Sequence, residues 1–207
     1  MLSKEELIAF EEEMGECFTN KQILAPMHLD NGNEDQLIEI FKMVKSNDWV
    51  CCSWRSHYKC LLKGVPKELL KEKILQGKSI GLCFKDYNII SSAIVAGILP
   101  ISVGIAWTIK QKGEKRRVWC FLGDTTAETG VFHECWKYSC AWHLPIKFII
   151  EDNNLSVCTD TRKVWNNHTA IIDDYDGPEL VSFNHGYVFK YKSKYPHAGT
   201  GGKRIQF

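Results

Sequence analysis

Two short apolar segments with a helical stretch between them constrain the fold most. Residues 116–122 and 146–151 have the length of buried strands, and each ends in polar residues. Residues 127–142 carry apolar side chains at i, i+4 spacing, which predicts a helix. A crossover of this length joins two parallel strands in the right-handed sense. We therefore expect an α/β protein with a mainly parallel sheet.

The length is consistent with one folded domain. A chain of 207 residues buries a core without disulfides or structural metals, so we expect a single domain over residues 1–207. We also expect a helical N-terminal extension over about residues 1–45. Ser3 and Glu6 form a capping-box pattern there. Apolar residues then recur on one helical face: Leu7, Phe10, Met14 and Phe18.

Charge and cysteine usage exclude several classes of protein. Lys and Arg total 26 and Asp and Glu total 25, a net charge of +1, which argues against nucleic-acid or membrane-surface binding. The nine cysteines form no C-x-x-C pair, and the chain starts with an acidic segment rather than an apolar leader. We expect reduced thiols in a cytoplasmic protein.

One uncharged stretch has the length of a membrane span. Residues 89–109 hold 21 positions without a charged side chain. Serines, glycines and a proline interrupt it, however, and such small residues favour close backbone approach. We expect a buried loop followed by a core helix, and no membrane contact.

Polar residues at the ends of the two predicted strands suggest a site. Asp124 follows the first strand and Asn153 follows the second, 29 positions later. Both would lie at the carboxyl edge of a parallel sheet, where such sheets bind ligands. Carboxylate and amide oxygens suit Mg²⁺ or Ca²⁺, and Mg²⁺ usually completes its shell with phosphate oxygens. The pattern predicts a metal that holds a phosphorylated cofactor. The alternative is a helix cap at Asp124.

A longer motif makes the cofactor specific. The run GDTTAETGVFHECWKYSCAWHLPIKFIIEDNN resembles the thiamine-diphosphate motif of the alpha subunits of 2-oxo acid dehydrogenases. Upstream, WRSHYKCLLKG resembles that family's Arg-x-His segment, and IVAGILPISVGIA resembles its cofactor-cradling loop and following helix. The match covers residues 27–161. It implies the three-layer αβα thiamine diphosphate-binding fold and its cofactors, thiamine diphosphate and Mg²⁺.

The resemblance assigns a metal set and part of a diphosphate site. Asp124, Asn153 and the backbone carbonyl of Leu155 would ligate Mg²⁺. Thr125 and Thr126 would face the diphosphate. Arg55 would pair with a diphosphate oxygen, which suits its fork of donors, and Trp54 would lie beside it. The alternative for Arg55 is a surface ion pair.

The remaining assignments concern the ring end of the cofactor and catalysis. Backbone groups at Ala93, Ile94 and Val95 would hold the aminopyrimidine ring. The candidate catalytic residues are His57, in the Arg-x-His segment, and His197, in YPHAGTGG, which resembles a late active-site loop histidine. The alternatives are a core histidine with satisfied hydrogen bonds at position 57 and a mobile tail around position 197.

Two departures from the family pattern affect the site. Thr125 stands where the family usually has glycine, which narrows the approach to the diphosphate. Asp152 stands where an asparagine is usual, so Asn154 is a second candidate for the metal ligand.

The resemblance implies a shared active site. In that family a glutamate from a separate beta subunit contacts the pyrimidine ring, and no residue here was found to replace it. We therefore expect an alpha-type subunit that works with a beta-type partner, in a heterotetramer, to decarboxylate a 2-oxo acid. The alternatives are the cofactor-binding half of a split transketolase-like carboligase and an inactive cofactor-binding or regulatory subunit.

Overall fold

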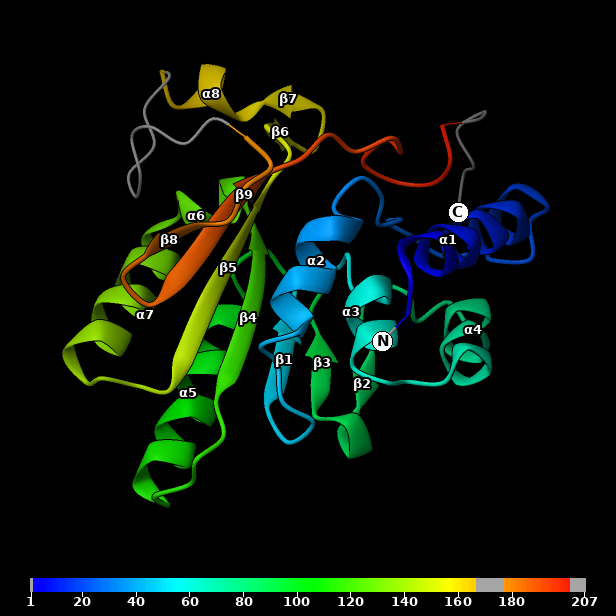
Figure 1. The fold of residues 1–207 in the computed structure, drawn as a ribbon. Helices are drawn as coiled ribbons and strands as arrows, with labels where there is room; N and C mark the ends of the chain where they lie inside the picture. The colour runs from blue at the N-terminus through cyan, green and yellow to red at the C-terminus, as the bar shows by residue number, and fades with distance from the viewer. Residues whose placement is uncertain (1, 167–176, 202–207) are drawn as a thin grey trace.

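A seven-stranded sheet forms the centre of the molecule (Figure 1). The computed structural model describes residues 2–166 and 177–201. The sheet order is β2-β3-β1-β4-β5-β9-β8, and all pairs from β3 to β9 are parallel. The edge strands β2 and β8 pair antiparallel. The bounds are β1 Trp49–Cys52, β2 Cys83–Phe84, β3 Ile89–Ser91, β4 Val118–Gly123, β5 Ile146–Asp152, β8 Val181–Phe183 and β9 Gly186–Lys190. The predicted α/β fold with a mainly parallel sheet is confirmed.

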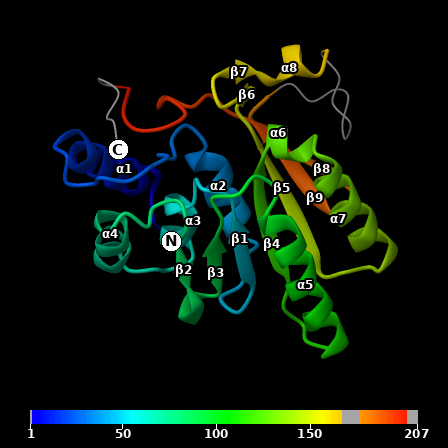
Figure 2. The same ribbon diagram turned by 180° about the vertical axis from the view of Figure 1, so that it is seen from behind.

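Helices cover both faces of this sheet, which gives three layers (Figures 1 and 2). One face packs against α1 Lys4–Thr19, α2 Glu34–Phe41, α3 His57–Leu62 and α4 Lys67–Leu75. The other face packs against α5 Ile98–Gln111, α6 Asp124–Ala127 and α7 Gly130–Ala141. Beyond the sheet lie a short 3-10 turn, η1 Lys85–Tyr87, a hairpin of β6 Leu155–Ser156 and β7 Thr159–Asp160, and α8 Thr161–Val164.

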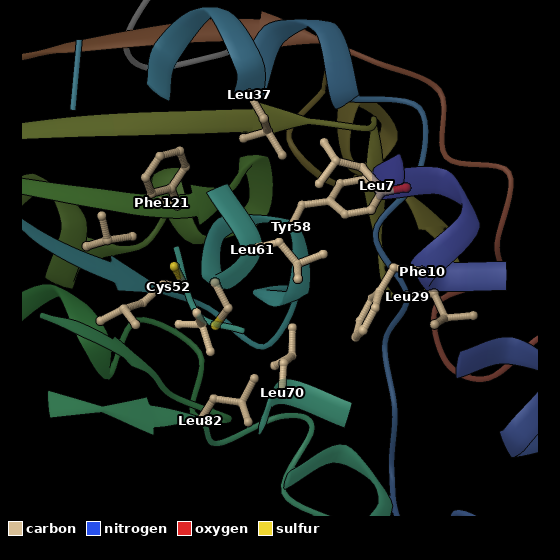
Figure 3. Close-up of a cluster of buried hydrophobic side chains, with 14 of the residues drawn as sticks. Leu7, Phe10, Leu29, Leu37, Cys52, Tyr58, Leu61, Leu70, Leu82 and Phe121 are labelled. Carbon is tan, nitrogen blue, oxygen red and sulfur yellow. The ribbon is translucent and has the colours of Figure 1, made fainter. Parts of the chain in front are cut away.

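Side chains along the strands point alternately to the two faces of the sheet and so form two separate cores. In β4, Trp119 and Phe121 face the first helical layer, whereas Val118, Cys120 and Leu122 face the second. All five side chains are buried. Figure 3 shows Phe121 in the first core with Tyr58, Leu61 and other labelled residues. A strand that is apolar on both faces is typical of a parallel sheet covered by helices on both sides.

The N-terminal segment contributes two helices to the first core. Ser3 accepts a hydrogen bond from the backbone of Glu6 and completes the predicted capping box. The four residues predicted to share one face of α1 are all buried against the sheet layer: Leu7, Phe10, Met14 and Phe18. Both helices of the predicted extension, in the described residues 2–45, are therefore packed into the same core as β4 and β5.

The uncharged stretch from residue 89 to residue 109 is β3, a connecting loop and most of α5. The helix is a core element, as expected, with Leu99 and Ala106 fully buried. The expectation of a buried loop is wrong for residues 93–95, because Ile94 and Val95 are 69% and 53% exposed. Among the described residues, no helix combines the length and apolar character needed to cross a bilayer.

The β4–α7–β5 crossover has the predicted parallel arrangement, with Gly123 opposite Glu151 at its carboxyl edge. The helix predicted over about residues 127–142 is α7, which begins three residues later than expected because Thr129 caps it, whereas Ala127 ends the short helix α6. The N-cap position of α6 is Gly123, so the alternative of Asp124 as a cap is wrong. The carboxyl ends of β4 and β5 therefore place Asp124 and Asn153 on the same edge.

Candidate functional site

A pocket lies at the carboxyl ends of β1, β4 and β5. It opens to solvent, and its volume, counted together with the space at its mouth, is about 620 Å³. We call it the strand-end pocket. Nine of the twelve predicted site residues line it: Trp54, Arg55, Val95, Asp124, Thr125, Thr126, Asn153, Leu155 and His197. The described residues that complete the lining are Ser53, Gly123, Glu151, Ser156, Val157 and Tyr191. The parallel topology explains this gathering, because three strands end at one edge.

Asp124 is the most unusual group in the pocket. Its side chain is almost fully buried, and its Oδ2 atom has no hydrogen-bond partner among the described residues. Burial raises the pKa of this carboxyl to about 7, and the nearby Asp152 adds to the effect. A buried carboxylate without a compensating partner is unfavourable, so the site favours a cation at this position.

The donors around Asp124 fit the predicted Mg²⁺. Asn153 and Leu155 line the same pocket as Asp124, so a carboxylate and an amide, both hard oxygen donors, belong to its lining, and the Leu155 carbonyl is the third predicted donor. The Oδ1 atom of Asn153 accepts a hydrogen bond from the backbone of Leu155 at 3.0 Å, which fixes the turn that carries both residues. Asn154, the second candidate ligand, is not among the lining residues and has a left-handed backbone with a φ of 59°.

Arg55 and the two threonines form the polar wall of the pocket. The guanidinium of Arg55 donates to the carbonyl oxygens of Leu29 at 3.3 Å and His197 at 3.2 Å. No carboxylate of the described chain lies within ion-pair distance of it, so the surface ion pair considered above is not formed. The hydroxyl of Thr125 lies 3.2 Å from that of Thr161 at the start of α8. The guanidinium of Arg55 therefore bonds neutral carbonyl groups in the described part of the chain.

His197 belongs to a small aromatic cluster at the pocket wall. The Nδ1–H of His28 donates to the carbonyl oxygen of His197, and the two rings lie 4.6 Å apart. Trp54 contacts both histidine rings. Burial lowers the pKa of His28 to about 4 and also lowers that of His197, with Arg55 contributing to the second shift. Both imidazoles are therefore neutral near pH 7.

The segment after β9 is held against the N-terminal part of the chain, and Figure 1 shows it running from β9 toward α1. The backbone of Gly199 donates to the carbonyl of Met27 at 2.9 Å. Gly32 adopts a left-handed φ of 88°, and a Cβ there would lie 2.2 Å from the carbonyl oxygen of Lys192. Only glycine fits at such a contact. This packing brings His197 to the pocket.

The structure places His57 outside the strand-end pocket. Its side chain is fully buried, with Nδ1 3.0 Å from the carboxylate of Glu11 and Nε2 2.9 Å from the hydroxyl of Ser79. Burial disfavours its protonation, but Glu11 outweighs that effect and raises the pKa of His57. The geometry favours the alternative interpretation of a core histidine with satisfied hydrogen bonds.

The loop before α5 reaches the pocket at one residue only. Val95 lines it, whereas Ala93 and Ile94 do not. The carbonyl of Ile94 accepts a hydrogen bond from Gly97 at 3.0 Å, so it is engaged in a turn. The described chain therefore does not bring all three predicted backbone positions into the pocket.

Sequence reasoning did not assign Glu151, Tyr191 or His28 to the site. Glu151 is the last but one residue of β5 and the first residue of the polar run at that strand end, a position that the strand-end argument reaches without further information. Tyr191 follows β9 and becomes adjacent to β5 only through the strand order. His28 lies far from His197 in the chain, so no local pattern links them.

Comparison with known proteins identifies the family. The model of the family described as "Dehydrogenase E1 component" matches residues 4–174. The alpha subunit of a pyruvate dehydrogenase E1 component from Porphyra purpurea is 28% identical over 165 residues, which are 72% of this chain and 48% of that protein. The alpha subunit of an acetoin:2,6-dichlorophenolindophenol oxidoreductase from Bacillus subtilis is also 28% identical, over 74% of this chain and 49% of that protein.

A third relative, the alpha subunit of a pyruvate dehydrogenase E1 component from Rickettsia prowazekii, is 30% identical over 74% of this chain and 50% of that protein. The chain spans about half the length of these relatives. The family match includes β4, β5 and every predicted site residue except His197. This chain is a member of the dehydrogenase E1 component family.

Proposed function

We propose that this chain is an alpha-type subunit that binds thiamine diphosphate through Mg²⁺ and decarboxylates a 2-oxo acid together with a beta-type partner. One observation carries the proposal. The strand-end pocket gathers Asp124, Asn153, Thr125 and Arg55, and the Asp124 carboxylate is buried there without a complete set of partners. A cation bound to a diphosphate would compensate that carboxylate and occupy the remaining donors of Arg55.

Each residue has a defined task in this proposal. Asp124, Asn153 and the carbonyl of Leu155 would hold Mg²⁺, while Thr125, Thr126 and Arg55 would face the diphosphate. Trp54 and Val95 line the same pocket and would exclude water from the apolar part of the cofactor. When bound, thiamine diphosphate supplies the nucleophilic carbon and the electron sink that decarboxylation of a 2-oxo acid requires.

His197 is the candidate catalytic residue that lines the pocket. Its lowered pKa keeps the imidazole neutral, so it can accept a proton at one ring nitrogen and donate at the other. Arg55 and His28 hold the backbone carbonyl of the same residue, which fixes where the ring lies. We propose that His197 orients the carboxylate or carbonyl of the substrate or transfers a proton to it.

A partner chain is supported by the rim of the pocket. Three apolar lining residues are unusually exposed: Val95 at 53%, Leu155 at 46% and Val157 at 57%. Exposed apolar groups around a pocket are typical of a surface that another chain covers. The glutamate that lines the described part of the pocket, Glu151, already bonds Lys59 and Asn33. A beta-type subunit would supply a free glutamate, and we propose a heterotetramer of two such pairs.

Calorimetry combined with an activity assay tests the proposal. The purified chain should bind thiamine diphosphate only when Mg²⁺ is present, and the chain mixed with a beta-type subunit from the same organism should decarboxylate a 2-oxo acid. Absence of Mg²⁺-dependent binding would refute the cofactor assignment. Full activity of the isolated chain would refute the shared site. Binding without turnover in the mixture would favour the inactive-subunit alternative, and turnover of a sugar phosphate would favour the carboligase.

We also propose a cytoplasmic location for this chain. All nine cysteines are free, and seven of them are buried or partly buried. Burial raises the pKa of Cys51 to about 12, so that thiol stays protonated and unreactive. Thiols of this kind are compatible with a reducing compartment. Fractionation of cells that express the tagged chain tests the location, and recovery from an oxidising compartment would refute it.

A further inference from the structure

A buried lysine connects the first helical layer to the wall of the strand-end pocket. Lys59 lies on α3 and is fully buried. Its ammonium lies 2.8 Å from the Oε1 atom of Glu151 and 2.9 Å from the Oδ1 atom of Asp30. It also lies 5.9 Å from the ring centre of Phe121 on β4. One side chain therefore joins α3, the loop before α2 and the carboxyl end of β5.

The surrounding bonds leave Lys59 little freedom. The amide of Asn33 also donates to the Oε1 atom of Glu151, at 2.9 Å, so this oxygen bonds both side chains. Asp30 accepts a bond from the backbone of Tyr58 at 3.3 Å, and its own backbone donates to Glu11 at 2.9 Å. Burial disfavours the ammonium form, but the two carboxylates outweigh this and raise the pKa of Lys59. The lysine is therefore charged and fixed.

The position of Glu151 gives this link a functional meaning. Glu151 lines the strand-end pocket and stands two residues before Asn153 on the same segment. Groups behind a metal ligand orient it, and their loss typically weakens metal binding. We propose that Lys59 is a positioning residue: by holding Glu151 against Asp30 it fixes the end of β5 and the turn that presents Asn153. The part that concerns cofactor affinity rests on the proposed function.

The first experiment does not require the cofactor. Hydrogen exchange of the backbone amides in residues 150–157 is measured in the full chain, for wild type, Lys59→Met and the matched control Tyr58→Phe. Tyr58 lies on the same helix and donates to Glu34 rather than Glu151. Lys59→Met should raise exchange in that segment about tenfold or more, whereas Tyr58→Phe should leave it near wild type. Unchanged exchange in a folded Lys59→Met protein would overturn the proposal.

Further variants keep the proposal testable if Lys59→Met does not fold. Lys59→Met leaves two buried carboxylates without a cation, so Lys59→Met combined with Asp30→Asn removes one of the two uncompensated charges. It should still show faster exchange in residues 150–157, and normal exchange would overturn the proposal. Combining Lys59→Met with Glu151→Gln should recover part of the protection, because a neutral amide no longer requires the ammonium. Failure of this rescue, with exchange as fast as in Lys59→Met, would show that Lys59 does not act through Glu151.

The second experiment measures affinity for thiamine diphosphate with Mg²⁺ by calorimetry in the same variants. Lys59→Met should weaken binding by about 10-fold to 100-fold, and Tyr58→Phe should not. If wild type does not bind the cofactor, the proposed function fails, and the exchange experiment alone decides the role of Lys59. If wild type binds and Lys59→Met binds equally well, the positioning role fails while the proposed function stands.

Discussion

Two buried carboxylates lie at neighbouring strand ends and differ in the partners that the described chain gives them. Glu151 lies near the end of β5 beside the ammonium of Lys59 and the amide of Asn33, so its charge has internal partners. Asp124 follows Gly123, the last residue of β4 and the one opposite Glu151, and one of the Asp124 oxygens has no partner in the described part of the chain. Burial raises the pKa of both groups. The difference separates a charge that the fold compensates itself from one that suits an external cation.

The largest effect is expected from removing the uncompensated charge. Asp124→Ala should weaken Mg²⁺-dependent binding of thiamine diphosphate at least 100-fold, which corresponds to about 3 kcal/mol. Titration calorimetry with and without Mg²⁺ measures this. The matched control is Asp86→Ala, because Asp86 is an exposed aspartate on η1 outside the pocket. Unchanged affinity of the Asp124 variant would refute the site assignment.

A buried charged pair such as His57 and Glu11 should instead affect the stability of the fold more than cofactor binding. His57→Ala leaves the Glu11 carboxylate buried without its imidazole and should lower the free energy of unfolding by about 2–4 kcal/mol. Urea denaturation measures this, with His133→Ala on the half-exposed side of α7 as a control. Cofactor affinity should be largely kept. A stable His57 variant that binds cofactor but has lost turnover would instead support the catalytic role implied by the family resemblance.

The pH dependence of stability distinguishes the two carboxylates further. The pKa of Asp124 in the folded chain is about 7, above its ordinary value of 3.8, so ionisation favours the unfolded chain. Without Mg²⁺, the wild type should lose about 1–3 kcal/mol relative to Asp124→Asn as pH rises from about 4 to 7. Denaturation across this range measures the difference. Saturating Mg²⁺ should reduce it, and a parallel response of both proteins would contradict the assignment.

The smallest effect concerns Arg55, which bonds two carbonyl groups but no carboxylate of the described residues. Arg55→Lys keeps the positive charge and loses the planar fork, so affinity for thiamine diphosphate should fall by about 10-fold, or roughly 1.4 kcal/mol. Stability should change little, because the bonds to Leu29 and His197 end on neutral carbonyls. Arg116→Lys, in an ion pair outside the pocket, is the control. Equal affinity would show that Arg55 does not contact the anion.

Local sequence patterns predicted the part of the site that lies at the ends of two strands joined by one crossover. Two apolar strands and the helix between them were sufficient to place Asp124 and Asn153 at one edge, because parallel pairing follows from the crossover. The start of the crossover helix was predicted three residues too early, because α7 begins at Gly130 with Thr129 as its cap. The motif at residues 123–126 and 153–155 therefore carried most of the predictive information.

Contacts between distant segments could not be predicted in this way. Lys59 of α3 meets Glu151 of β5 on one face of the sheet, and His28 meets His197, which lies far from it in the sequence. Neither pairing leaves a periodic signal, because each depends on which elements become neighbours in the folded chain. His57 shows the same limit: its sequence context suggested the pocket, whereas packing against α1 directs it to Glu11. Burial and partners decide the role of such residues.

The packing of Gly32 against Lys192 has a consequence for the order in which the site is made. On the ribosome, residues 27–32 are made about 160 residues before their partners at 191–199. Synthesis proceeds at about 5–20 residues per second. For roughly 4–15 seconds the nascent chain holds β4 and Asp124 without the wall that contains His197. Truncated nascent chains would therefore lack one wall of the site while already carrying the aspartate that suits a cation.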